Sequence, residues 1–211
     1  DNNNLENMQF FKQLSVGSSI AVNGIVINSI NPTQKIELEV KKAQLLGDCP
    51  TDYPIQKKKQ NMEYLREYVH LRTRTNTFNA VFRVRSVLAK AIRDYLQENN
   101  FIYINTPIIT GSNCEGAGEM FRVTTLDIDK VSKENYNPNI HDMDFFGKKV
   151  GLTISGQLEA EAMACSLGKV YTFGPSFRAE NSNTKRHAAE FWLIEPEVAF
   201  ADLNDIIVII N

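Results

Sequence analysis

The sequence predicts an α+β fold in which helices flank an antiparallel sheet. Two alternating segments, Val170–Glu180 and Phe191–Phe200, are joined by a polar loop, which is the pattern of two antiparallel strands. A helical repeat covers Phe78–Asn100, where apolar residues recur every three or four positions. With 211 residues, 43% hydrophobic and 23% charged, the chain is long enough for one large domain and a small companion.

The two predicted strands carry charges among their apolar residues. A period of two puts Arg178 and Glu180 on one face of the first strand, and Glu195 and Glu197 on one face of the second. Burying such charges without partners would cost several kcal/mol each, so they indicate a ligand. The alternative is an amphipathic hairpin whose exposed Arg178–Glu180 pair contributes only about 0–1 kcal/mol.

The loop between these strands, Asn181–Ala189, holds a basic cluster. Lys185, Arg186 and His187 follow one another at the expected tip of the hairpin, beside the mixed-charge face of the sheet. This arrangement suits a polyanion, although an ordinary solvated turn would contain the same residue types.

The stretch that runs from FRAE through RHAAEF to IEPEVAF is similar, without a gap, to the second signature of the class II aminoacyl-tRNA synthetases. Within that class it resembles the asparaginyl-tRNA synthetase family, of the aspartyl, asparaginyl and lysyl subgroup. The resemblance implies a class II synthetase-type sheet and an aminoacyl-tRNA ligase that uses ATP and Mg²⁺. It also implies activation of L-asparagine to asparaginyl-adenylate, transfer to tRNA(Asn) in translation, and a cytoplasmic location.

The resemblance assigns the ATP site to residues at one end of the hairpin. Arg178 becomes the catalytic residue, because its planar fork can hold an α-phosphate oxygen and the attacking carboxylate together. Glu180 is expected to accept from the adenine amino group, and Phe191 to stack on the purine. Arg186 and His187 are expected to meet the β- and γ-phosphates. Alternatively, the Phe191 ring could simply pack in the hydrophobic core.

The amino-acid pocket is implied by a second set of positions. The loop SNCEGAGE places Glu115 near the substrate ammonium, where the residues alone suggest only a glycine-rich turn. The segment SGQL places Gln157 against the ammonium or carboxylate, and Glu195 and Glu197 complete the pocket. Aspartyl enzymes carry a lysine at the position of Ala160, so its absence disfavours an aspartate side chain and favours asparagine.

A helix and a strand resemble the first class II signature, which in the family forms the homodimer interface. This region, Phe78–Pro107, contains the predicted helix followed by FIYINTPIIT. Pro107 removes a donor from the strand and therefore favours an edge or a switch between neighbouring strands. The resemblance implies a homodimer through this region, whereas the residues alone fit an αβ unit of many folds.

The resemblance to the family covers part of its barrel domain and part of its catalytic domain. Alternating residues predict three short strands at Val16–Ile27, Lys35–Val40 and Lys41–Leu46. They resemble only part of an OB-like anticodon-binding barrel, and the third class II signature is absent, so we expect a chain truncated at both ends. The expected domains are 1–55 for the partial barrel, 56–77 for a hinge, and 78–211 for the first part of the catalytic domain.

Composition excludes several other classes of protein. The net charge of −2 creates no general attraction for nucleic acid, although residues 56–93 carry an excess of eight positive charges. That excess could guide an RNA backbone or could be a solvated helix face. Three scattered cysteines and three histidines indicate neither zinc nor disulfides, and we expect no metal site within this chain. No apolar run approaches about 20 residues, so we expect no membrane partner.

Two other functions stay open from the sequence. One is a non-catalytic synthetase-like module that binds nucleotide, RNA or a partner protein. The other is a relative that activates aspartate, or an ammonia ligase that makes asparagine from the same adenylate. The sequence also predicts a helix over Ser155–Gly168 with Ser155 as its N-cap, and a polar insertion at Leu126–Lys149 to which no function is assigned.

Overall fold

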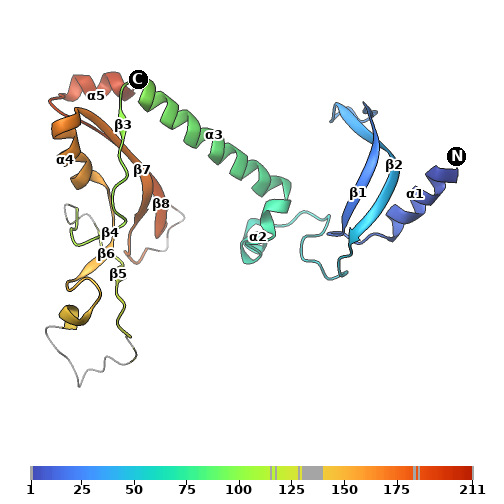
Figure 1. Ribbon diagram of the computed structural model, residues 1–211, viewed down its shortest axis with the longest axis horizontal. Coiled ribbons are helices and arrows are strands. Elements are labelled where there is room, and N and C mark those ends of the chain that lie inside the picture. Colours follow the sequence, from blue (N-terminus) through green and yellow to red (C-terminus); the bar gives the residue numbers. More distant parts are fainter. Residues whose placement is uncertain are drawn as a thin grey trace. The chain divides into compact units, whose positions relative to one another are not determined.

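The computed structural model describes residues 2–114, 116, 118–127, 129, 140–182, 184 and 186–210, except for the side chains of 2–7 and of 210. Contacts divide the chain into two compact units, Asp1–Leu88 and Ala89–Asn211. Figure 1 shows an antiparallel strand pair in the first unit and a larger set of strands and helices in the second. The predicted partition into three domains stays a prediction.

The first unit begins with a helix that the sequence did not predict and continues with a long antiparallel pair. Helix α1 spans Asn2–Gln13, β1 spans Ser19–Asn28 and β2 spans Ile36–Gly47. The prediction of three strands is wrong, because 36–47 forms one strand. Asn23 pairs with Lys42 while Gly24 pairs with Val40, so Lys41 is an extra residue. Such a bulge interrupts the alternation of side chains between the two faces, so the sequence pattern of this single strand resembles that of two strands.

A small helical connector completes the first unit. Asn61 caps α2 (Met62–Glu67) by accepting a hydrogen bond from the Tyr64 amide at 2.7 Å. A 3₁₀ turn, η1 (Arg72–Arg74), follows. The apolar residues that hold the connector together are Ile55, Leu65 and Phe78, all buried.

The second unit is built around β7, which lies between β3 and β8. Strand β8 runs antiparallel to β7, with Phe177 opposite Glu190 and Thr172 opposite Glu195, whereas β3 pairs in parallel. The predicted hairpin is therefore confirmed, although its first strand ends at Phe177 rather than Glu180. The bounds of the three strands are Ile102–Tyr103 for β3, Lys169–Phe177 for β7 and Glu190–Val198 for β8.

A second, smaller sheet lies beyond Pro107. Its strand order is β4-β6-β5, with both neighbours antiparallel to β6. The chain pairs with β7 before the proline and with β6 after it, so the predicted switch between neighbours is confirmed. The strands are β4 (Ile109–Thr110), β5 (Arg122–Val123) and β6 (Val150–Leu152).

Helices and turns cover the strands of this unit. The predicted repeat forms α3 (Asn76–Glu98), which continues across the boundary between the two units. The other elements are η4 (Ile140–Met143), α4 (Gln157–Leu167) and α5 (Leu203–Ile210). Among the residues that the structure describes, no helix has both the length and the apolarity needed to cross a membrane.

Strand β7 is buried on both faces because successive side chains point to opposite sides. On one face Tyr171 and Phe173 pack with Leu96 and Phe101. On the other face Val170 packs against α4, together with Ile104 and two alanines, Ala160 and Ala164. Val170 and Tyr171 are both fully buried, so β7 is a rigid base for the residues that follow it. The α+β prediction is confirmed in this unit.

The start of α4 differs from the prediction by one residue. Gly156 is the N-cap, and Ser155 instead accepts the Gln157 amide hydrogen at 3.1 Å through its side-chain oxygen. Gly168 ends the helix as predicted, with a φ of +85° and a hydrogen bond from its amide to the Ala164 carbonyl at 2.8 Å. The short loop before α4 is thus fixed by Ser155.

Candidate functional site

One cavity gathers all five residues that were predicted to bind ATP. Strand β7 ends at Phe177, and the Arg178 amide donates to the Ala189 carbonyl at 3.0 Å, which keeps the two chain ends paired beyond the strands. The cavity has a volume of about 480 Å³, within the range of about 300–1,000 Å³ typical of ligand sites. The residues that line it are Arg178, Glu180, Ser182, Arg186, His187, Ala188, Ala189 and Phe191.

Arg178 has an unused donor in this cavity. Its guanidinium carbon lies 5.3 Å from the centre of the Phe191 ring, which is a cation–π distance. Its Nε is buried and has no hydrogen-bond partner among the residues that the structure describes. Because an unsatisfied buried donor costs about 1–3 kcal/mol, this N–H is poised for an acceptor supplied by a ligand.

The Glu180 side chain lies against Gly118, in the segment that precedes β5. The Ala179 amide donates to the Glu119 carbonyl at 2.8 Å, which fastens the two segments together. A Cβ atom on Gly118 would meet the Glu180 carboxylate, so a larger residue at this position would require the Glu180 side chain to move. Gly118 was not among the predicted residues. Glu115, in the same loop, lies outside the described residues.

The loop between β7 and β8 is organised by Thr184. Its hydroxyl forms a hydrogen bond with His187 Nδ1, and its oxygen accepts the Arg186 amide at 3.4 Å. The His187 amide also bonds to the Thr184 carbonyl at 3.4 Å. These contacts hold Arg186 and His187 on one turn, a role of Thr184 that sequence spacing alone did not reveal. Lys185 lies outside the described residues.

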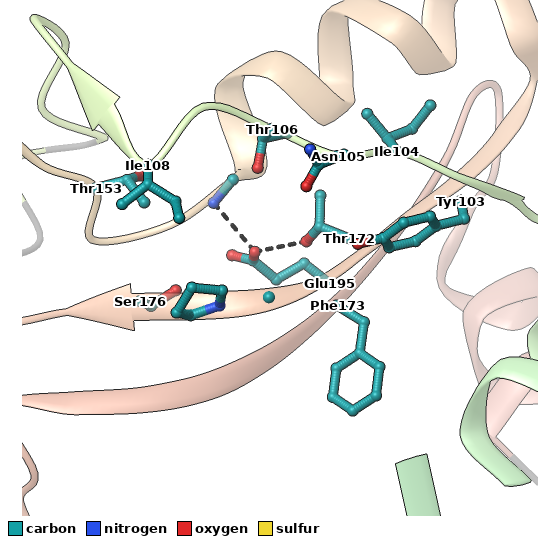
Figure 2. A pocket seen from close by; sticks show the side chains of 13 residues that line it. Tyr103, Ile104, Asn105, Thr106, Ile108, Thr153, Thr172, Phe173, Ser176 and Glu195 are labelled. Carbon is teal, nitrogen blue, oxygen red and sulfur yellow. Dashed lines mark hydrogen bonds between the residues drawn. The ribbon is translucent and has the colours of Figure 1, made fainter. Parts of the chain in front are cut away.

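Glu195 is the centre of a second, smaller site. Its carboxylate accepts hydrogen bonds from the Gly156 amide at 3.1 Å and the Thr172 hydroxyl at 2.8 Å, both drawn in Figure 2. The Ser155 hydroxyl donates to its other oxygen. The adjoining cavity holds only about 40 Å³, which suffices for water and not for an amino acid. Glu195 therefore fixes the loop before α4 in the conformation described.

Gln157 and Glu197 lie on the elements that Glu195 links. Gln157 receives a weak hydrogen bond from the Cys114 thiol at 3.6 Å and donates to Glu161 at 2.8 Å. Burial raises the pKa of Glu197, and the nearby carboxylates of Glu161 and Glu195 raise it further. Negative charge concentrated in this way favours a cation, such as an ammonium group.

Ala160 faces away from the open surface. It is fully buried among Ile104, Ala164 and Val170, and it lines neither of the two cavities described above. Its methyl group lets α4 pack closely on β7. The predicted role of Ala160 in the choice of amino acid stays a prediction.

Potential metal ligands do not cluster in the part of the chain that the structure describes. No group of three or more histidine, cysteine, aspartate or glutamate side chains is arranged to hold an ion. Within the same residues Cys49 and Cys165 form no disulfide.

Three comparisons bear on this site. The family model for class II tRNA synthetases (D, K and N) matches residues 61–211. The asparagine–tRNA ligase of Clostridium kluyveri is 56% identical over 201 residues, which cover 95% of this chain and 43% of that protein. The corresponding ligase of Bacteroides fragilis is 52% identical over 197 residues, covering 93% of this chain and 42% of the relative. The chain thus spans less than half the length of these relatives.

Solved structures show the same fold. Asparaginyl-tRNA synthetase from Pyrococcus horikoshii, complexed with asparaginyl-adenylate, is similar with a TM-score of 0.77 and 31% identity. The match covers 97% of this chain and 43% of that one. Asparaginyl-tRNA synthetase from Entamoeba histolytica gives a TM-score of 0.75 at 24% identity, covering 98% and 44%, and supports the fold alone. From the matched family model and this fold, the chain belongs to the class II tRNA synthetases (D, K and N).

Proposed function

We propose that this chain is part of an asparagine–tRNA ligase. Such an enzyme activates L-asparagine with ATP and transfers it to tRNA(Asn). One observation carries the proposal: Arg178, Glu180, Arg186, His187 and Phe191 line one cavity of nucleotide size. Support comes from the Pyrococcus relative, which is complexed with asparaginyl-adenylate.

The adenylation step needs positioning and charge neutralisation more than it needs proton transfer. The substrate carboxylate is already ionised at neutral pH, so no general base is required to attack the α-phosphate. The free donor of Arg178 supports a role in which its guanidinium holds the α-phosphate and the attacking carboxylate together. Charge that develops on the phosphate would then be met by a preorganised cation.

The other cavity residues divide between the two ends of ATP. Phe191 would stack on the adenine while its opposite side contacts Arg178, and Glu180 would accept from the adenine amino group. Arg186 and His187, held on the turn of Thr184, would bind the β- and γ-phosphates. Magnesium is expected to accompany the phosphates, but the described residues do not form a site for it, so no step is derived through the ion.

The amino-acid site is proposed around the start of α4. Gln157, Glu197 and Glu115 would bind the ammonium group, whose positive charge would offset the burial and the neighbouring carboxylates that raise the pKa of Glu197. Glu195 would complete the pocket and keep the loop at Ser155 in place. Ala160 would favour asparagine over aspartate, because no lysine is present at this position to pair with a carboxylate. A neutral carboxamide needs hydrogen bonds and no counter-charge.

Further proposals concern partners and location. We propose a cytoplasmic homodimer that contacts its partner through the region Phe78–Pro107. The support is a set of exposed apolar side chains on one face of α3: Val81, Val84, Val87 and Leu88. The partial barrel at 1–55 and the hinge at 56–77 are proposed to serve tRNA binding.

The direct test is amino-acid-dependent exchange between ATP and pyrophosphate, measured on the complete reading frame that contains this chain. Exchange with asparagine and none with aspartate is the expected result. Exchange with aspartate would overturn the specificity proposal. No exchange with either amino acid, in a protein that still binds ATP, would favour the non-catalytic module.

A variant pair makes this test specific to the site. Arg178→Ala should lower asparagine-dependent exchange by at least about 10²-fold, the usual loss for a group that stabilises charge in the transition state. Lys12→Ala, on the exposed surface of α1, should leave exchange unchanged. Equal rates for the two variants would contradict the role of Arg178.

A further inference from the structure

A partly buried contact joins the two segments to which the proposed function assigns the substrate ammonium group. Cys114 directly precedes Glu115 in the loop between β4 and β5, and Gln157 is the first residue of α4. The Cys114 thiol donates a hydrogen bond to Gln157 Oε1 at 3.6 Å, although 43 positions of the chain separate the two residues. Cys114 is only 4% exposed. The thiol therefore meets Gln157 from the interior, where water competes little for the bond.

This contact bears on the orientation of the Gln157 carboxamide. The oxygen of the group accepts hydrogen bonds and its nitrogen donates them, and the two ends exchange places when the group turns over. In the structure the oxygen faces the Cys114 donor, while Nε2 donates to Glu161 at 2.8 Å. Turned over, the carboxamide would place its oxygen against a carboxylate and its NH₂ against a sulfur atom, which is a weak acceptor. The two neighbours therefore favour the same orientation.

Cys114 holds the better protected end of the carboxamide. Glu161 is exposed, so water competes for its contact with Nε2 and the net gain from that hydrogen bond is small. The contact with Cys114 is partly buried, and a hydrogen bond gains strength where the surroundings are less polar. The thiol thus adds a constraint that Glu161 does not duplicate.

Both partners of the contact lie on segments that other hydrogen bonds fix. Beyond Cys114, the loop is fastened by the bond from the Ala179 amide to the Glu119 carbonyl, at 2.8 Å. At the start of α4, the Gln157 amide donates to Ser155 Oγ at 3.1 Å. The thiol therefore acts from a fixed position, as a group that orients a binding residue must.

We propose that Cys114 is a positioning residue for the amino-acid substrate, because its thiol holds the Gln157 carboxamide in the orientation that binds the ammonium group. The inference rests on the proposed function, which gives Gln157 that role. A carbonyl oxygen can accept two hydrogen bonds, so the bond from the thiol is compatible with one from an ammonium. Without the thiol, the carboxamide would spend part of its time in other orientations, and the affinity for asparagine would fall in proportion.

The alternative is that Cys114 only fills space, as a small buried apolar residue. Three substitutions separate the two roles. Cys114→Ala removes the donor and leaves a void, Cys114→Val restores apolar volume without a donor, and Cys114→Ser restores a donor. If the role were packing alone, valine would preserve the affinity for asparagine better than serine does.

Asparagine-dependent ATP–pyrophosphate exchange, measured on the complete reading frame, tests the proposal. Cys114→Ala and Cys114→Val should each raise the KM for asparagine about three- to tenfold, the range expected for the loss of one hydrogen bond. The KM for ATP and kcat should stay within about twofold of wild type, a split that reports weaker substrate binding rather than misfolding. Cys114→Ser should recover most of the loss. Cys165→Ala, which removes the exposed thiol of α4, is the control and should change none of these constants.

A second set of variants tests whether the effect passes through Gln157. In a Gln157→Ala background, Cys114→Ala should raise the KM for asparagine no further, because the group that it orients has gone. An equal additional rise would overturn the proposal, and so would a Cys114→Val protein with the KM of wild type. Wild type that exchanges with asparagine, together with an unchanged KM in Cys114→Ala, would overturn this inference alone. Wild type without asparagine-dependent exchange would overturn the proposed function, and this inference with it.

Discussion

Glu195 shows how one carboxylate can define the geometry around it. It accepts hydrogen bonds from the side chain of Ser155, the amide of Gly156 and the side chain of Thr172. These partners come from the loop before α4 and from β7, so the carboxylate ties both to β8. An amide has only one acceptor oxygen, and its NH₂ group would face one of these donors.

Glu195→Gln is therefore expected to lower the free energy of unfolding by about 1–3 kcal/mol. The midpoint of urea denaturation measures the change. Glu98→Gln, an exposed glutamate on α3, is the control and should leave the midpoint unchanged. A midpoint for Glu195→Gln equal to that of the control would mean that these hydrogen bonds contribute no net stability.

Substitution of Glu197 should raise the free energy of unfolding, in contrast to substitution of Glu195. Its pKa is raised in the folded protein by burial and by the charges of Glu161 and Glu195. A raised carboxyl pKa means that stability is greatest below the ordinary value of about 4.3 and falls as the pH rises through the folded-state value. Glu197→Gln removes this penalty, so it should stabilise the protein at neutral pH and have little effect at about pH 4.

Denaturation of wild type and Glu197→Gln at the two pH values measures this difference. Asparagine should stabilise wild type and not the variant, if Glu197 binds the ammonium group as proposed. A variant that is less stable than wild type at neutral pH would contradict the electrostatic explanation.

At the scale of elements, the sequence was informative where a pattern repeats over many residues. The α3 repeat and the β7–β8 hairpin extend over several periods, and both were predicted with bounds that differ by at most a few residues. Pro107 likewise acts through a local property, the missing amide hydrogen, so its effect on strand pairing could be predicted. The residues around the Arg178 cavity could be predicted for the same reason, since they lie on one continuous motif.

Elements that depend on distant contacts were not predictable. The bulge at Lys41 is visible only in the register between β1 and β2, and the strands β4 and β5 have two residues each. Glu195 and Thr172 face each other because of strand register, which no spacing within one strand reveals. Gly118 was missed because its importance comes from the approach of Glu180, 62 positions later in the chain.

The segment around η4, which had no assigned function, has a structural anchor in Asp144. Its carboxylate accepts hydrogen bonds from the Thr124 hydroxyl at 2.6 Å, from the Thr125 amide and hydroxyl, both at 2.9 Å, and from the Phe145 amide at 2.8 Å. Hydrogen bonds from the Thr124 side chain, and then from the Thr125 amide, hold the pKa of Asp144 well below its usual range. The end of β5 and the turn after η4 are thereby fastened together.

Asp144→Asn should destabilise this element in a pH-dependent way. A lowered pKa means that the contribution to stability is present above the ordinary aspartate value of about 3.9 and is lost as the pH falls below it. The variant should therefore be less stable than wild type at neutral pH, and the difference should shrink in acid. Hydrogen exchange of the Thr125 and Phe145 amides measures the local effect. Asp142→Asn, on the exposed side of the same turn, is the matched control; equal exchange in the two variants would contradict the anchor.

At the scale of the whole molecule, the apolar face of α3 is the feature that most needs a partner. Val81, Val84, Val87 and Leu88 lie on one side of the helix, and their exposed fractions range from 39% to 68%. Contiguous exposed apolar groups of this kind mark a protein interface. The proposed homodimer would bury them, which explains why a predicted amphipathic helix carries its apolar face outward.

The double variant Val84→Asp/Val87→Asp in the complete reading frame tests this assembly. Two carboxylates in the centre of an apolar interface would lose their hydration without gaining partners, so the dimer should dissociate. Sedimentation equilibrium measures the mass: wild type is expected as a dimer and the variant as a monomer. Ser86→Asp places the same charge on the opposite side of α3 and should remain dimeric. A dimeric Val84→Asp/Val87→Asp protein would exclude this face from the interface. A monomeric wild type would exclude the homodimer itself and leave the apolar face to other parts of the same chain.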